Sequence, residues 1–431
     1  MMKLYMIRHA KAQDRSLGIY DPARSLTDVG RHRLRQMLPA LQEELKNQSL
    51  ILWASHAARA QETAIQTAIA LKHATIETKP FIYEGDISDL IMALEDVDPS
   101  DTVLLFGHEP ELGDWISYLA EDPGHIRTAG MVRLEINSLA NSQATIQWIQ
   151  QPEKNFPADV APTLDAATAL RLVLDQWVQA QVAFRDFEHA PDLPRTTHRL
   201  RVSIRRARAL LSFLKPTLHD TTYDDLSAHM RALMQDFALI RELDVLIEQI
   251  THVLPQSTEL LPYLEDLLAK ARASAKQRAA SGALQMRLDQ VKSDLLVLSF
   301  DNAKAIDSDD FKKKLTKRYE RWKKQGHKLH QNLDYADYSS IHHLRVLYKK
   351  LRYVTEVLED FDWDVSTEDF AGYQDKLGAI CDTYANAIHL TDLTQETKNK
   401  LLINEISSFI EAQMDLRTKL VTELREEGYS Q

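Results

Sequence analysis

Cysteine is almost missing from this sequence of 431 residues, in which Cys381 is the only one. A single cysteine excludes an intramolecular disulfide and is typical of a reducing compartment. Long apolar runs are missing too, and none approaches the length needed to span a bilayer. The start of the chain also lacks the basic region, apolar core and small-residue cleavage site of a signal peptide. These absences predict a cytoplasmic protein.

Positive charge is in short supply overall, because 52 Lys and Arg face 63 Asp and Glu, giving a formal net charge of −11. Such a charge disfavours nonspecific attraction to nucleic acid or anionic membranes. Any polyanion-binding site must therefore be local. The composition, 44% hydrophobic and 27% charged, is that of a folded soluble chain. At this length we expect two or three domains.

A proline-containing seam over residues 150–162 divides the sequence. Before it, short strand-like runs alternate with helix-like runs, as in α/β domains. These runs lie at residues 50–54, 102–106, 131–136 and 144–149. After it, long segments with a 3.6-residue period and no convincing strand predict an all-helical part, in keeping with only 12 glycines. We predict a first domain over residues 1–155 and a helical domain over residues 160–431.

Two arginines and two histidines follow strand-like runs in the first domain. Arg8 and His9 follow a further apolar run at residues 3–7, Arg59 follows the run at 50–54 at the opening of an Ala-rich helix, and His108 follows the run at 102–106. The carboxyl ends of parallel strands lie at one edge of a sheet, so these side chains are expected to lie together.

These residue types suit phosphoryl chemistry. A neutral imidazole is a good nucleophile toward phosphorus, and guanidinium groups can hold the non-bridging oxygens in bidentate fashion. No metal and no other cofactor is required if arginines stabilise the charge. The alternative is structural, since a lone histidine after a strand is more often a hydrogen-bonding group. The joint pattern is what favours catalysis.

Four ordered motifs in the first 150 residues resemble the histidine phosphatase superfamily, in particular its small SixA-like branch of phosphohistidine phosphatases. They are Arg8-His9-Ala10-Lys11-Ala12, Asp21-x-x-Arg24-x-Leu26-Thr27-x-x-Gly30-Arg31, Ser55-x-x-x-Arg59-Ala60-x-Glu62-Thr63 and Gly107-His108-x-Pro110. The resemblance implies a phosphoglycerate-mutase-like α/β fold. It also implies that His9 forms a phosphohistidine and that Arg8, Arg59 and His108 complete the phosphate pocket.

The resemblance leaves two further roles to assign. Arg24 is an additional candidate for binding the substrate phosphate. The general acid is expected to be a carboxylate after the third strand, where Glu84 and Asp86 are the candidates and Glu84 is preferred. The alternative for Glu84 is a solvated loop position. Short insertions around the site predict an open cleft, which suits a phosphorylated side chain on a protein.

A basic, helix-like segment occurs twice in the second part of the sequence. The segment from His198 to Arg208 matches the segment from His342 to Arg352 at a constant offset of 144 residues. In each copy the cations form one stripe and apolar residues form another, so the helix can pack by one face and present cations from a second.

Such a stripe is usually a solvated face paired with acids. The local charge balance counts against that here, because residues 193–219 hold seven Lys or Arg and no Asp or Glu. Cations without acidic partners in their own helix repel one another. Keeping the cluster twice is easier to explain if a polyanion neutralises it. Few aromatics accompany these cations, which disfavours nucleic acid as that polyanion.

Over residues 160–431 the sequence resembles the CHAD family, the conserved-histidine α-helical domain. Its motifs are the two His-x-x-Arg-x-x-x-(Arg/Lys)-(Arg/Lys)-x-Arg helices, Arg241-Glu242-Leu243-Asp244-Val245, and Gln374-Asp375-Lys376-Leu377-Gly378 with Asp382. The resemblance implies two pseudo-symmetric four-helix bundles and inorganic polyphosphate as ligand. The implied contacts are His198, Arg201, Arg205, Arg206, Arg208, Lys215, His342, Arg345, Lys349, Lys350 and Arg352.

Together these patterns predict a phosphatase, a phosphoric monoester hydrolase acting through a phosphohistidine, linked to a polyphosphate-binding module. The substrate is expected to be phosphohistidine or another phosphomonoester. Two alternatives stay open. Polyphosphate or a phosphorylated small molecule is itself the substrate, or the protein is a non-catalytic scaffold that binds polyphosphate.

Overall fold

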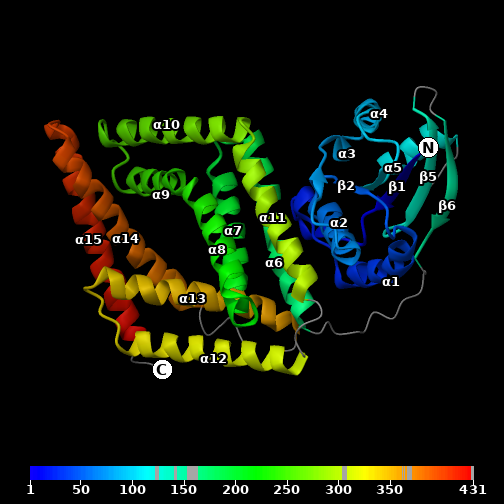
Figure 1. Cartoon of the computed structure of the whole chain (residues 1–431). Coiled ribbons are helices and arrows are strands. Elements are labelled where there is room, and N and C mark those ends of the chain that lie inside the picture. Colours follow the sequence, from blue (N-terminus) through cyan, green and yellow to red (C-terminus); the bar gives the residue numbers. More distant parts are fainter. Residues whose placement is uncertain are drawn as a thin grey trace. The chain divides into compact units, whose positions relative to one another are not determined.

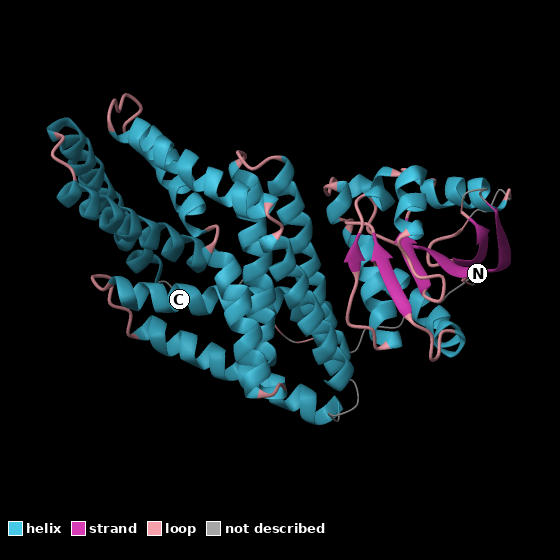
Figure 2. Cartoon of the chain, turned by 45° about the horizontal axis from the view of Figure 1, so that its top comes forward, coloured by secondary structure: helices cyan, strands magenta, loops and turns pink. Residues whose placement is uncertain are grey.

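The computed structural model describes residues 1–121, 126–139, 143–152, 164–302, 308–361, 363, 365 and 371–428. The chain forms two compact units. The first consists of Met1–Asp186 and Leu288–Ile306, and the second of Phe187–Arg287 and Asp307–Gln431. In the part described, all strands gather in one sheet in the first unit and the rest of the regular structure is helical (Figures 1 and 2).

The first unit begins with an α/β domain, as predicted. Its strands are β1 (Met2–Arg8), β2 (Leu50–Ala54), β3 (Glu77–Thr78), β4 (Thr102–Gly107), β5 (Met131–Ser138) and β6 (Gln143–Gln150). Its helices are α1 (Asp28–Glu44), α2 (Ala58–Leu71), α3 (Phe81–Glu84), α4 (Ile87–Glu95) and α5 (Glu111–Ala120), with short 3-10 helices at η1 (Arg15–Leu17) and η2 (Asp21–Ala23). The brief β3 is the strand that the sequence pattern did not indicate.

The sheet has the strand order β3-β2-β4-β1-β5-β6. Neighbouring strands from β3 to β1 are parallel, whereas β5 and β6 run antiparallel. The carboxyl ends of β1, β2 and β4 therefore lie side by side, at the edge where α/β sheets bind ligands. This arrangement confirms the α/β prediction with a mixed sheet of six strands.

Helices cover both faces of this sheet (Figure 1). Side chains of β1 and β4 pack with α3, α4 and α5 in one apolar cluster that includes Leu4, Met6, Leu105 and Trp115. The opposite face is covered by α1 and α2 (Figure 1). Every residue of β4 is buried, which is typical of a parallel strand with helices on both sides. The core thus fixes the strands whose ends carry the histidines.

Two helices from the second part of the sequence complete the first unit. They are α6 (Ala166–His189) and α11 (Ala283–Asn302), of which residues up to 186 and from 288 belong to this unit. On α11, the fully buried Lys292 donates to the Ile76 carbonyl at 3.1 Å. Consequently, the compact units do not coincide with the division at residues 155 and 160 that the sequence predicts.

The second unit is helical throughout its described residues, as predicted. Besides the remaining turns of α6 and α11, it holds α7 (Pro194–Leu214), α8 (Asp220–Gln235), α9 (Ala238–Val253), α10 (Leu260–Ala280), α12 (Ser308–Gln331), α13 (Tyr338–Leu358), α14 (Ala371–Glu396) and α15 (Lys400–Gly428), with 3-10 turns at η3 (Lys215–Thr217) and η4 (Glu359–Phe361). None of the helices described has the length and apolarity of a membrane span.

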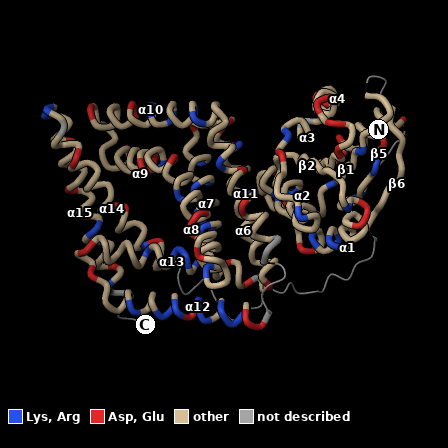
Figure 3. Tube along the Cα trace, in the orientation of Figure 1, with Lys and Arg blue, Asp and Glu red and all other residues tan. Residues whose placement is uncertain are grey.

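The internal repeat appears directly in the helix boundaries. Both α7 and α13 are 21 residues long, and the offset of 144 relates their first residues as well as their last. Each helix buries an apolar stripe, for example Leu200 and Ile204 in α7 and Leu344 and Leu351 in α13. Lys and Arg residues are frequent along α7, α12 and α13 (Figure 3).

Candidate functional site

The two predicted histidines lie together at the carboxyl edge of the sheet. His9 directly follows β1, and its backbone N–H donates to the Gly107 carbonyl at 3.0 Å. His108 directly follows β4, and the two imidazole centroids are 5.1 Å apart. The register of the parallel pair β1 and β4 therefore brings both rings together.

A hydrogen bond sets the tautomer of His9. Its Nδ1 lies 2.7 Å from the Ala10 carbonyl oxygen, which can only accept, so Nδ1 carries the proton. The lone pair of a neutral ring is then on Nε2. Burial, together with the nearby charges of Arg59 and Arg8, lowers the pKa of His9 to about 3. A neutral imidazole with a free Nε2 is the form needed for nucleophilic attack.

The predicted arginines surround this imidazole. Arg8, Arg24 and Arg59 each disfavour the charged form of His9 and lower its pKa. The Arg8 guanidinium donates to the Ile126 carbonyl at 2.7 Å, and burial lowers its own pKa. Arg24 and Arg59 are 8% and 4% exposed. Guanidinium groups held this far from water bind an oxyanion strongly because little solvent screens them.

Asp21 organises two of these arginines, a role that the sequence reasoning did not assign. Its carboxylate accepts from Arg59 at 2.9 Å, from the Arg24 Nε at 3.0 Å and from the Tyr83 hydroxyl at 2.9 Å. These partners hold the pKa of Asp21 at about 2, against the effect of its partial burial. The aspartate stood in the second motif, and that position was the available signal for its importance.

His108 is held by a serine from the end of β2. Its Nε2 lies 2.6 Å from the Ser55 hydroxyl oxygen, while its buried Nδ1 has no hydrogen-bond partner among the described residues. Burial, followed by the charges of His9 and Arg59, holds the pKa of His108 well below its ordinary value. The ring is therefore neutral, with Nδ1 not engaged in a hydrogen bond among the described residues.

The structure describes the side chain of only one of the two candidate general acids, Asp86. Glu84 ends α3, and its side chain lies outside the described part of the structure. Asp86 is exposed and caps α4, because its carboxylate accepts from the backbone N–H groups of Ser88 and Asp89. Asp86 thus has a local structural role, and Glu84 stays a prediction.

The low pKa of His9 predicts an unusual pH profile. Since the ring stays neutral until pH falls toward 3, kcat/KM for an aryl phosphate should change by less than about threefold between pH 8 and pH 5, after correction for substrate ionisation. A nucleophilic histidine with an ordinary pKa of about 6.5 would lose about 30-fold over that range. An acid limb near pH 6.5 in steady-state rates would contradict the burial of His9.

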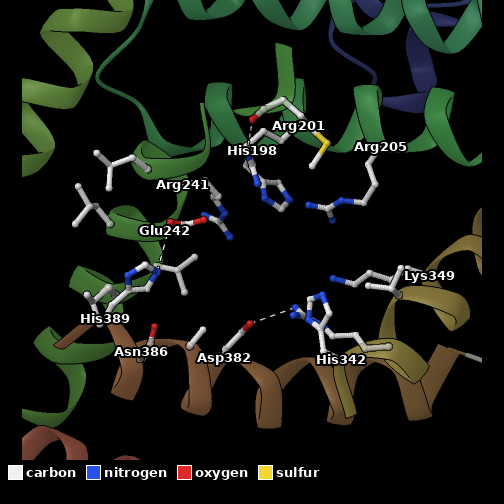
Figure 4. A pocket seen from close by; sticks show the side chains of 18 of the residues that line it. His198, Arg201, Arg205, Arg241, Glu242, His342, Lys349, Asp382, Asn386 and His389 are labelled. Carbon is white, nitrogen blue, oxygen red and sulfur yellow. Dashed lines mark hydrogen bonds and ion pairs between the residues drawn. The ribbon is translucent and has the colours of Figure 1, made fainter. Parts of the chain in front are cut away.

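The second predicted site is a cavity of about 960 Å³ within the helical unit, between α7 and α13 (Figure 4). Eight of the eleven predicted contacts line it: His198, Arg201, Arg205, Arg208, His342, Arg345, Lys349 and Lys350. The copies face each other, with Arg205 from α7 and Lys349 from α13 both directed into the space (Figure 4).

Three predicted contacts do not line the cavity. Arg206 pairs with Glu356 at 3.2 Å, and Arg352 pairs with the same carboxylate at 3.0 Å. Lys215 lies 3.6 Å from Asp224 and above the Tyr223 ring. The cationic stripe suggested Arg352 and Lys215, and the family motif suggested Arg206, but all three side chains lie against acids instead. These three side chains fit the alternative reading, in which the cations are on a solvated face and pair with acids.

The cavity also contains cations that the repeat could not indicate. Arg231 comes from α8 and Arg241 from α9, and neither belongs to the duplicated helix. Arg241 stood in the second family motif, which was a signal for it. Tyrosines line the walls as well: Tyr223, Tyr263, Tyr338 and Tyr353.

Positive charge exceeds negative charge in this cavity. Among its described lining residues are eight Lys or Arg and three carboxylates. Arg345 pairs with Asp382 at 3.2 Å and Glu242 lies 3.6 Å from His389, whereas no described acid lies within ion-pair distance of Arg205 or Lys349. The crowding has a measurable consequence, because burial, Arg345 and Arg205 lower the pKa of Lys349 to about 8. The lining therefore carries a net positive charge.

A family model for the CHAD domain matches residues 168–391, more than half of the chain. The chain belongs to the CHAD family. The CHAD match includes the cavity-lining helices α7 and α13, and it starts inside α6, within the first compact unit. No curated protein matches the chain.

Solved structures resemble the two parts of this CHAD protein. The protein histidine phosphatase SixA complexed with tungstate is 23% identical with a TM-score of 0.31, covering 35% of this chain and 97% of that one. The SixA protein from Agrobacterium tumefaciens is 22% identical with a TM-score of 0.30, at 35% and 97% coverage. The CHAD domain from the plant Ricinus communis is 20% identical with a TM-score of 0.45, covering 64% of this chain and 93% of that one.

Proposed function

We propose that the N-terminal domain is a phosphatase that forms a phosphohistidine at His9. The observation that carries this proposal is the hydrogen bond from His9 Nδ1 to the Ala10 carbonyl, which leaves Nε2 of a neutral ring free among three arginines. Nε2 attacks the phosphorus, the bond from phosphorus to the leaving oxygen breaks, and water later releases phosphate from the nitrogen. Glu84 is the proposed donor of the proton that the leaving oxygen requires.

Arg8, Arg24, Arg59 and His108 are the proposed ligands of the transferred group. In-line transfer spreads negative charge over the non-bridging oxygens, and buried guanidinium groups stabilise that charge more than they stabilise the ground state. Among the described residues, no group of three His, Cys, Asp or Glu side chains is placed to hold a metal ion. The chain's own cations are sufficient for the charge stabilisation proposed.

We propose further that the cavity between α7 and α13 binds inorganic polyphosphate. The excess of cations in the cavity and the lack of acidic partners at Arg205 and Lys349 support this, as does the association of the CHAD family with polyphosphate. The equal lengths and constant offset of α7 and α13 support two pseudo-symmetric four-helix bundles as the finer architecture. Cytoplasmic residence is part of the same proposal.

A substrate panel tests the phosphatase proposal. Purified protein should release phosphate from phosphohistidine or an aryl phosphate, and polyphosphate of defined length should keep its length on a gel. Shortening of polyphosphate that depends on His9 would instead make polyphosphate the substrate. Wild-type protein inert on every phosphate donor would leave a polyphosphate-binding scaffold as the function.

The pKa of Lys349 predicts how polyphosphate binding responds to pH. A bound phosphate favours the ammonium form, so binding takes up a proton once pH exceeds about 8. Affinity should therefore fall as pH rises, by about tenfold between pH 7 and pH 9 for this single group. Lys349→Arg should flatten the dependence, because guanidinium stays charged. Calorimetric affinities that do not change over this range in wild type would contradict the assignment.

A further inference from the structure

The first helix of the CHAD region contacts the proposed phosphate site. Residues 166–186 of α6 belong to the same compact unit as that site, although the CHAD match starts at residue 168. Asp175 and Gln179 of this helix are four residues apart, so they project from one face, one turn from each other. Both support the segment from Asp21 to Leu26, which carries Arg24.

Gln179 fixes the backbone on both sides of Arg24. Its Nε2 amide donates to the Ala23 carbonyl and to the Ser25 hydroxyl oxygen, each at 3.0 Å. The partners are the residues immediately before and after Arg24, and a primary amide has two N–H groups with which to bond them. Together the two bonds restrain the backbone on either side of Arg24.

Asp175 supports the backbone of Leu26 indirectly, through Arg31 and Glu62. Arg31 lies 3.2 Å from Asp175 and 2.7 Å from Glu62, whose Oε2 accepts the Leu26 backbone N–H at 2.9 Å. The side chains of Arg31, Asp175 and Glu62 are 8%, 9% and 0% exposed. A buried carboxylate needs such a counter-ion. Asp175 has a second one in Arg171, whose Nε lies 3.8 Å from its carboxylate.

The backbone held in this way determines where two phosphate ligands point. Arg24 donates through Nε to Asp21 at 3.0 Å and through NH1 to the Gln13 carbonyl at 2.6 Å. Arg59 donates to the Asp21 carbonyl at 2.8 Å as well as to its carboxylate. A shift of this segment would therefore displace Arg24 directly and Arg59 through Asp21.

We propose that Gln179 is a positioning residue for the phosphate-binding arginines, so that the proposed phosphatase site is completed by a helix of the CHAD region. The inference rests on the proposed function of the N-terminal domain and adds a component to it. Gln179 does not touch the phosphate itself. It holds the backbone that aims Arg24, and through Asp21 it helps to aim Arg59.

The test compares three variants of the full-length chain. Gln179→Ala removes both hydrogen bonds, and Gln179→Glu keeps the size of the side chain while replacing the donating nitrogen by oxygen. Gln181→Ala is the matched control, because Gln181 is two residues away on α6 and its amide donates to Asp289 at 2.7 Å rather than to the arginine segment. Tungstate affinity, KM and kcat for an aryl phosphate, and thermal unfolding are measured for each.

We expect both Gln179 variants to bind tungstate about tenfold more weakly and to raise KM to a similar degree, with kcat within about threefold of wild type. Gln181→Ala should match wild type in tungstate affinity, even if its melting temperature falls. Hydrogen exchange of the backbone amides of residues 23–26 should accelerate in both Gln179 variants and not in Gln181→Ala, a readout that needs no turnover.

Three outcomes would overturn these ideas, and they differ. Wild-type tungstate affinity and wild-type exchange rates in Gln179→Glu would refute the positioning role and leave the phosphatase proposal intact. Wild-type protein that neither binds tungstate nor hydrolyses any phosphomonoester would refute the proposed function and this inference with it. Equal losses in Gln179→Ala and Gln181→Ala would show general loosening of α6, which also refutes a specific role.

Discussion

Replacing His9 by alanine is expected to abolish phosphatase activity, with a loss in kcat of about 1,000-fold or more, because no other group can then form the covalent intermediate. Wild-type protein quenched during turnover should carry one phosphoryl group on His9, stable in alkali and labile in acid as a nitrogen-linked phosphate is. Mass spectrometry of an alkaline digest locates that group. His9→Ala should carry none and should retain wild-type affinity for polyphosphate.

A matched control for this experiment is His73→Ala. His73 is a partly buried histidine just beyond the end of α2, and burial lowers its pKa too, yet it follows no strand of the catalytic edge. Its loss should leave turnover within about twofold of wild type. Equal activity of wild type and His9→Ala would exclude His9 as nucleophile, whatever the substrate.

Reversing the charges of Arg205 and Lys349, two cavity cations with no described acid within ion-pair distance, should remove polyphosphate binding. The double variant Arg205→Glu with Lys349→Glu replaces two attractions by two repulsions in a partly buried space. Each charge-assisted hydrogen bond contributes about 1.5–3 kcal/mol, so a loss of affinity of about 100-fold or more is expected. The dependence of affinity on salt should also flatten, since fewer counterions are released on binding.

Neighbours of these residues provide the control. The control is the double variant Arg206→Glu with Arg352→Glu, which makes the same change of charge outside the cavity. Lys350 is not used in the control because it lines the cavity. This second pair removes the ion pairs to Glu356 and should cost less than about fivefold in affinity at physiological salt. If both pairs of substitutions weakened binding equally, net charge rather than the cavity would be responsible.

Sequence reasoning predicted the strands well because their signals are local. Apolar runs of β-forming residues ended at His9 and His108, and a parallel sheet necessarily aligns such ends. The repeat at offset 144 predicted two equivalent helices for a similar reason, since equal sequence gives equal helix boundaries. The assignments of Arg8, Arg24 and Arg59 as phosphate ligands stay predictions until binding is measured, although the structure gathers these residues.

What sequence could not give depends on tertiary packing. The rotation of α7 about its axis places Arg205 in the cavity and Arg206 against Glu356. The sequence of the basic run does not show which surroundings each side chain will have. Asp21 offered no periodic signal for its hydrogen bonds to Arg59 and Arg24. Gln179 bonds Ser25 across a separation of 154 residues in the sequence, which no local pattern could indicate.

The complete burial of α2 from Ala58 to Ala68 sets a limit on where this protein can be cut. A fragment ending at residue 155 would lose Asp175 and Lys292, so Arg31 would keep only Glu62 and the Gln61 amide would face water. Removing one member of a buried ionic group commonly costs about 3–5 kcal/mol, a large part of a domain's stability. An expression boundary placed at the proline seam would therefore yield an aggregation-prone polypeptide, and a soluble catalytic half has to bring two distant pieces of chain with it.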